Sequence, residues 1–253
     1  MIVSNCVQNV VWLPLSSSND KRKPRPLSPT AKTEHIRVCT NRTCRRQGSM
    51  QTLEIMRALS PPDLPINSCG CLGRCGAGPN VALVPEGIII GHCGTAAAAA
   101  RIIARHYEHE DDDATIRKSL DALALRKRAQ VEFDMGNFPQ ADLLLSQAIH
   151  LKPFGGLHII YTYRSQVRLA MKHYLEALED AQNALNLAPQ YTEQACICEG
   201  DAFMAMEQYD AAEKSYSMCL QIDPTIRSSK AFKSRVAQVQ EKLVAANMPD
   251  NQQ

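Results

Sequence analysis

Four cysteines form two close pairs in the first half of the chain. Cys39 and Cys44 enclose four residues in CTNRTC, and Cys71 and Cys75 enclose three residues in CLGRC. A longer segment with a helical pattern separates the pairs, so the four thiolates can converge from two loops. Thiolates in this arrangement bind either a 2Fe-2S cluster, with two thiolates on each iron, or one structural zinc ion. The spacing predicts a metal centre and leaves both metals open.

Other residues near the pairs suit such a centre. Arg45, Arg46 and Arg74 are expected either to offset the negative charge of a cluster or to be solvated surface residues. Cys69 and Cys93 are additional cysteines, which we interpret as buried or peripheral thiols, with altered ligation or a regulatory disulfide as the alternative. Glycines can bring backbone N–H groups close to buried sulfur. Those beside the second pair are Gly70, Gly73, Gly76 and Gly78.

The segments that must position these cysteines have the pattern of a small α/β layer. HIRVCT alternates apolar and polar residues like a strand, and SMQTLEIMRAL places its apolar residues on one helical face before two prolines end it. VALV and IIIG flank a Pro-Glu-Gly turn, which indicates an antiparallel hairpin, and AAAAARIIARHYEH indicates a closing helix.

A family resemblance narrows the choice of metal. CTNRTCRRQGS and CLGRCGAGPNVALVPEG closely resemble the thioredoxin-like 2Fe-2S ferredoxins and the small cluster-bearing subunit of NADH dehydrogenase. The resemblance implies a thioredoxin-like α/β domain at residues 34–107, a 2Fe-2S cluster and one-electron chemistry, with zinc as the alternative. The ligands that it implies are Cys39, Cys44, Cys71 and Cys75.

The second half of the chain contains an internal repeat. Three segments fall into register when the chain is aligned on Pro153, Pro189 and Pro224. They are MGNFPQADLLLSQAIHLKP, MKHYLEALEDAQNALNLAP and MEQYDAAEKSYSMCLQIDP. These features resemble three tetratricopeptide (TPR) units, which implies an all-α solenoid over residues 118–224. Residues 225–247 are predicted to form the capping helix, and residues 248–253 a tail.

The TPR resemblance implies a groove that binds a protein partner. The candidate contact residues on this groove are Arg126, Gln130, Tyr163 and Arg164. Chaperone-binding members of the family hold a C-terminal carboxylate with Asn, Lys and Arg, at positions where this chain has Tyr163, Gln194 and Cys198. We therefore do not expect the repeats to bind the C-terminal carboxylate of a chaperone.

Composition restricts the remaining classes of function. The chain has 253 residues, a net charge of +2 and 45% hydrophobic residues, so its composition gives no indication of nucleic-acid binding. It has no apolar run long enough for a membrane span. Residues 1–33 are basic and rich in Ser and Pro, which is typical of a disordered transit peptide. We predict the chloroplast stroma as the location, with the mitochondrion or the cytoplasm as alternatives. Residues 108–117 are predicted to be an acidic linker.

Together these features predict a carrier of electrons or clusters that docks to its partner through the repeats. The sequence contains no catalytic carboxylate pair, nucleophile-base arrangement or nucleotide-binding motif, so we do not expect an enzyme. The alternative is a scaffold or assembly factor in which the four-cysteine site is structural or sensory and holds 2Fe-2S or zinc.

Overall fold

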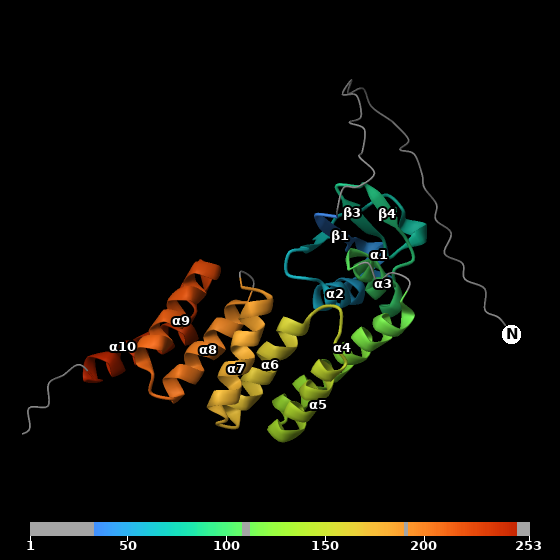
Figure 1. The fold of residues 1–253 in the computed structure, drawn as a ribbon. Coiled ribbons are helices and arrows are strands. Elements are labelled where there is room, and N and C mark those ends of the chain that lie inside the picture. The colour runs from blue at the N-terminus through green and yellow to red at the C-terminus, as the bar shows by residue number, and fades with distance from the viewer. Residues whose placement is uncertain (1–32, 108–111, 190–191, 247–253) are drawn as a thin grey trace, which may run out of the picture.

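The computed structural model describes residues 33–107, 112–189 and 192–246 (Figure 1). The segment predicted as a transit peptide lies outside the described residues except for Thr33. The predicted tail, residues 248–253, also lies outside them. Within the described part, a small sheet domain is followed by a row of helices.

A four-stranded sheet organises the first domain, which we call the cysteine domain (residues 34–107). The strand order is β2-β1-β3-β4, with β2 parallel to β1 and the other neighbours antiparallel. Its elements are β1 (His35–Cys39), α1 (Arg42–Arg46), α2 (Ser49–Leu59), β2 (Ile66–Cys69), the 3-10 helix η1 (Cys75–Ala77), β3 (Val81–Val84), β4 (Ile88–Ile90) and α3 (Ala96–His106).

The sheet and two helices share one apolar core. Val38 of β1, Val81 of β3, Met56 of α2 and Ile103 of α3 have no exposed surface, because both helices pack their apolar sides against the central strands. The predicted strand, helix, hairpin and closing helix are therefore confirmed. Two short elements, α1 and β2, were not predicted. The chain leaves β1, passes through α2 and returns as β2, which lies parallel to β1.

Helices alone form the second part of the chain, as predicted from its period. They are α4 (Asp113–Asp134), α5 (Phe138–His150), α6 (Leu157–Ala170), α7 (Tyr174–Leu187), α8 (Glu193–Ala205), α9 (Tyr209–Ile222), the 3-10 helix η2 (Pro224–Ser228) and α10 (Lys230–Ala246). Consecutive helices pack against each other, and α6 also contacts both α4 and α8, so that the first helices of the repeats form one layer (Figure 1).

Small residues hold the repeats together at close range. The aligned alanines Ala141, Ala177 and Ala212 are completely buried. Ala184 and Cys219, each seven residues after one of these alanines, are also completely buried. Small side chains at these positions let the helix backbones approach closely. In the capping region, α10 packs against α9, with Phe232 and Val239 buried.

The boundary between the two parts differs from the prediction. Helix α4 begins at Asp113, inside the segment predicted to be linker, because the Asp112 carboxylate accepts hydrogen bonds from two N–H groups of the first turn. Residues 108–111 of that segment lie outside the described part. Ile116 and Leu123 of α4 belong to the core of the cysteine domain. The first repeat helix is therefore shared between the two parts.

Two glycines bring the backbones of the two parts into direct contact. A Cβ atom at Gly155 would lie 1.9 Å from the carbonyl oxygen of Leu59, and one at Gly156 would lie 2.1 Å from that of Ala58. Gly156 also has a φ of +73°, which favours glycine. The turn between α5 and α6 thus rests on the end of α2 and fixes the cysteine domain against the repeats.

Candidate metal centre and partner-binding face

The first cysteine pair lies where β1 passes into α1. Cys39 ends the strand and Cys44 lies in the helix, with exposed fractions of 1% and 2%. Burial disfavours the Cys39 thiolate, but N–H groups of Asn41 and Leu72 and the neighbouring Cys44 thiol together hold the pKa of Cys39 below its ordinary value. Burial raises the pKa of Cys44. The pKa values of this buried pair are therefore shifted in opposite directions.

The second pair lies on an exposed loop. The Sγ atoms of Cys71 and Cys75 are 3.6 Å apart, and both residues are exposed. The backbone N–H of Gly73 donates to Cys71 Sγ at 3.4 Å, and this glycine has a φ of +79°. The turn conformation that glycine permits thus aims an N–H group at sulfur, as predicted for this loop.

The two pairs face each other. The Cys75 thiol interacts with the Thr43 side chain and electrostatically with Cys44, both in α1, while the Leu72 N–H interacts with Cys39. The neighbouring Cys71 thiol raises the pKa of Cys75. Within the described residues no three Cys, His, Asp or Glu side chains are grouped closely enough to hold a single metal ion. The four candidate ligands are thus two pairs on separate segments, with the Cys75 thiol near α1 and the Leu72 N–H near Cys39.

Close packing around Cys44 adds two residues to the site. A Cβ atom at Gly78 would lie 2.9 Å from Cys44 Sγ and 2.2 Å from the Gln47 side-chain oxygen, so this position needs glycine. Asn80 is buried, and its Nδ2 donates to Cys44 Sγ at 3.5 Å and to the Arg74 carbonyl oxygen at 2.7 Å. Asn80 was not predicted. For Gly70 and Gly76, a Cβ would meet nothing within 4 Å.

The two additional cysteines have different environments. Cys69 is half-buried in β2, directly beside Cys39 in the sheet register. Cys93 is buried, its Sγ lies 3.4 Å from the Gly91 carbonyl oxygen, and burial raises its pKa to about 12. The interpretation of Cys93 as a buried thiol is confirmed. The pKa of Cys69 is raised by burial and by electrostatic interaction with the nearby Cys39.

The four predicted partner-binding residues do not act as one group. The Arg126 guanidinium lies over the Tyr163 ring at 5.6 Å, and burial lowers its pKa. Arg164 instead binds the Asp180 carboxylate with two hydrogen bonds of 2.8 and 2.6 Å. Gln130 donates to Asp134. Only Arg126 and Tyr163 are brought together.

Two groups on this face have unused binding capacity. Arg126 makes no ion pair or hydrogen bond within the described part of the chain, although Glu54 of α2 is near enough to interact with it electrostatically. The side-chain oxygen of Gln130, one turn further along α4, is buried and accepts no hydrogen bond from a described residue. Because this oxygen is buried, only the Arg126 cation is placed to meet a ligand, and it suits a ligand with a carboxylate.

None of the described helices is long and apolar enough to cross a membrane.

Comparison with known proteins relates part of the chain to TPR proteins. No protein-family model matches the chain. It is 32% identical over 104 residues to the Protein STIP1 homolog of Dictyostelium discoideum, which covers 41% of this chain and 18% of that protein. It is 28% identical over 105 residues to human Tetratricopeptide repeat protein 12, which covers 42% of this chain and 14% of that protein. The chain thus spans less than a fifth of these relatives.

Solved structures similar to the chain are also TPR domains. The first TPR of Spaghetti (RPAP3) bound to the HSP90 peptide SRMEEVD shows 21% identity and a TM-score of 0.46, over 50% of this chain and 95% of that one. The Sgt2 TPR domain from Aspergillus fumigatus shows 22% identity and a TM-score of 0.47, over 52% of this chain and 87% of that one. With the observed helix order, the second part of this chain is a TPR-like helical solenoid, whose general role is protein docking.

One partner prediction is wrong. We did not expect the repeats to bind a chaperone C-terminal carboxylate, yet similar structures include TPR domains in complex with HSP90 and HSP70 peptides that end in EEVD. The exclusion depended on Tyr163, Gln194 and Cys198 alone. Three side chains do not exclude an anionic ligand on a face that keeps the cation of Arg126.

Proposed function

We propose that the cysteine domain holds a 2Fe-2S cluster on Cys39, Cys44, Cys71 and Cys75 and that the repeats dock the protein that exchanges electrons or clusters with it. The observation that carries the proposal is the meeting of two thiol pairs from separate loops. A 2Fe-2S cluster needs two thiolates on each iron, which is the arrangement that two pairs supply. The thioredoxin-like assignment of the sheet belongs to the same proposal.

The surroundings of the sulfurs support a cluster. The Gly73 N–H and the Asn80 amide donate to thiols that would become anionic ligands, and such hydrogen bonds stabilise negative charge on sulfur. Gly78 leaves the space beside Cys44 that a side chain would fill. When bound, a 2Fe-2S cluster supplies one-electron redox chemistry. The chain's own residues hold it, orient it through α1 and leave the Cys71 and Cys75 side exposed.

The repeats would bring a partner to this site. Since α4 is part of both the solenoid and the core of the cysteine domain, a partner on the repeats is held at high local concentration near the cysteines. Arg126 favours an acidic peptide with a terminal carboxylate, for which SRMEEVD is a suitable probe. We propose a carrier and adaptor rather than an enzyme, with residues 1–33 directing it to the chloroplast stroma.

Metal analysis of the full chain, purified without oxygen, tests the proposal. We expect two irons and two acid-labile sulfides per chain and a visible spectrum that dithionite bleaches reversibly. Cys71→Ser should lose the colour, because it removes one of the four ligands. Cys69→Ser is the matched control, two residues away, and should keep both colour and iron.

Other outcomes would decide against the proposal. One zinc ion per chain without visible colour would contradict a cluster and leave a zinc-containing adaptor. Reduction could also release the cluster and make the cysteine domain sensitive to proteases. This result would favour the structural or sensory alternative, because folding would then depend on metal occupancy.

A further inference from the structure

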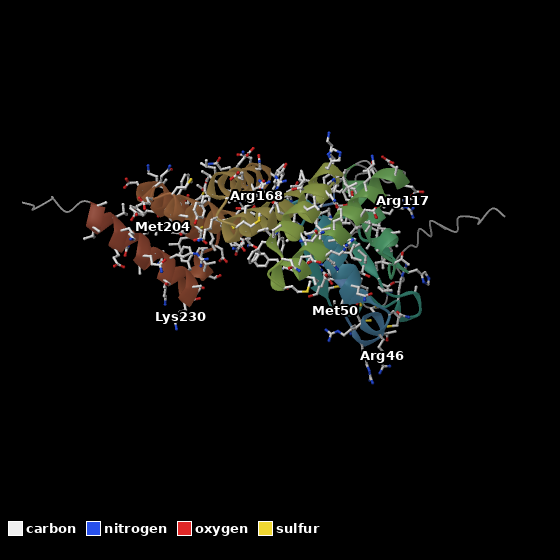
Figure 2. All side chains as sticks on the ribbon, turned by 90° about the horizontal axis from the view of Figure 1, so that it is seen from below. Arg46, Met50, Arg117, Arg168, Met204 and Lys230 are labelled. Atoms are coloured by element: carbon white, nitrogen blue, oxygen red, sulfur yellow. The ribbon has the colours of Figure 1, made fainter. Side chains whose placement is uncertain are left out.

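Helix α1 carries charge on one side and a candidate ligand on the other. Arg42 lies three and four residues before Arg45 and Arg46, so these side chains share one helical face. All three are exposed, whereas Cys44 is buried on the opposite side. Figure 2 shows Arg46 projecting outward from the cysteine domain. The residues that would hold the cluster and those that face a partner are therefore fixed on the same short element.

No acidic residue in the described part of the chain pairs with these arginines. The sequence contains no Asp or Glu from residue 35 to 53 or from residue 64 to 85, the two segments that supply the cysteines. Within the described part of the chain, the guanidinium groups of Arg42, Arg45 and Arg46 make no hydrogen bond or ion pair. Three positive charges thus face solvent without a partner, although the net charge of the chain is only +2.

The charged face is hollowed. A hollow of 640 Å³ is lined by Thr40, Asn41, Arg42, Arg45 and Arg46. The helix that carries the hollow also contacts the second cysteine pair, since the Cys75 thiol interacts with Thr43. A molecule bound against these arginines would therefore lie on an element that is in contact with both cysteine pairs.

We propose that this arginine face, Arg42, Arg45 and Arg46 with the hollow between them, docks an acidic surface of the protein that exchanges electrons or clusters with the chain. The inference rests on the proposed function and adds a second contact to that of the repeats. Charge complementarity selects the partner, since several close carboxylates match the guanidinium groups and speed the encounter at low salt. The hollow has no aromatic lining residue on which a base could stack, which disfavours nucleic acid.

Binding of a labelled acidic peptide tests the arginine face. Fluorescein-labelled deca-glutamate is titrated with the full chain as purified, and anisotropy is measured at low salt and at about 0.5 M salt, where the Debye length is only a few ångströms. We expect binding at low salt, loss at high salt, and at least fivefold weaker binding for R45Q/R46Q. The matched control, R117Q/K118Q, removes two exposed charges from α4 and should bind like the wild type; Figure 2 shows Arg117 on another part of the molecule.

Thiol protection in the metal-free full chain locates the bound peptide. Deca-glutamate should slow the reaction of Cys71 and Cys75 with neutral N-ethylmaleimide in the wild type and in R117Q/K118Q but not in R45Q/R46Q, as followed by peptide mass spectrometry. Equal peptide binding by all three chains would overturn the proposal. An oligouridylate of equal charge that binds more tightly than deca-glutamate would overturn it in favour of nucleic acid.

This test does not depend on the identity of the metal. If metal analysis finds zinc while R45Q/R46Q still weakens peptide binding, the cluster proposal fails and the arginine face stands. If the chain holds a reversible cluster and the peptide does not bind, the arginine face fails and the cluster stands.

Discussion

The cysteine domain and the repeats use their polar groups in opposite ways. Around the cysteines, the N–H of Gly73 and the amide of Asn80 point at sulfur, and the three arginines of α1 make no side-chain hydrogen bond or ion pair with a described residue. In the repeats, the Arg164 guanidinium is held by Asp180 between two helices. Polar side chains in the first region surround a candidate site, whereas Arg164 and Asp180 in the second hold two helices together.

The comparison shows that an arginine on a ligand-binding fold is not by itself a ligand contact. Arg164 and Arg126 lie on neighbouring first helices of the repeats, and each contacts a tyrosine ring at 5.6 Å. Only Arg164 has a buried carboxylate beside it. The two arginines should therefore have different roles. Loss of the Arg164 pair should lower stability, and loss of Arg126 should weaken binding.

The largest effect is expected at Asp180. Its side chain is 1% exposed and binds Arg164 and Arg168 at 2.6 and 2.9 Å, although burial raises its pKa. Asp180→Ala leaves two partly buried guanidinium groups without this carboxylate, and removal of one partner from a buried pair costs about 3 kcal/mol or more. Urea unfolding followed by far-UV circular dichroism measures the loss.

Asp142 provides the control for this prediction. It binds only Arg168, at 3.0 Å, and is more exposed. Asp142→Ala should cost only about 1 kcal/mol, because this carboxylate is partly solvated and Arg168 keeps its bond to Asp180. Equal losses for the two variants would show that the buried position of Asp180 has no special role and would remove the contrast between the two regions.

A smaller effect is expected for Arg126, and on binding rather than on stability. Arg126→Gln removes the one unpaired cation that lies over Tyr163, so affinity for SRMEEVD should fall about tenfold, the equivalent of about 1.4 kcal/mol. The unfolding midpoint in urea should change little. Fluorescence anisotropy measures the affinity, and the same peptide with an amidated C-terminus is the control.

Two results would contradict the role of Arg126. Equal binding of the free and amidated peptides would show that no terminal carboxylate is recognised. Loss of stability as large as that of Asp180→Ala would show that Arg126 is structural, like Arg164, and the repeats would then have no assigned cation for an anionic partner.

Features encoded over short distances could be predicted from the sequence. The pairs Cys39/Cys44 and Cys71/Cys75 follow from their spacing, and the repeats follow from the recurrence of Pro153, Pro189 and Pro224. The short elements α1 and β2 were missed because five and four residues give too little periodicity to recognise.

Features that depend on tertiary contacts could not be predicted. Asn80 is an ordinary loop residue in the sequence, and its donation to Cys44 becomes visible only when β3 lies beside β1. Arg164 meets Asp180 from a different helix. The start of α4 was misplaced because the acidic run, whose Asp112 caps the helix, has the composition of a linker.

The smallest expected effect concerns the turn inside each repeat. Gly136, Lys172 and Glu207 follow the first helix of the three units, with φ values of +81°, +65° and +60°. The N–H of each donates to the carbonyl three residues earlier, and the next N–H donates to the carbonyl five residues earlier. The three turns therefore have one geometry, which glycine adopts with the least strain.

Substitutions in both directions test whether this shared geometry governs the stack. Lys172→Gly should stabilise the chain by about 0.5–1 kcal/mol, because relief of the left-handed strain exceeds the added freedom of the unfolded chain. A Cβ atom at Gly136 would meet no other atom within 4 Å, so Gly136→Ala adds backbone strain without a steric clash. It should destabilise the chain by a similar amount. Urea unfolding midpoints measure both. A loss of stability in Lys172→Gly would mean that the lysine side chain makes an interaction outweighing its backbone strain, and the repeats would then not be equivalent at this turn.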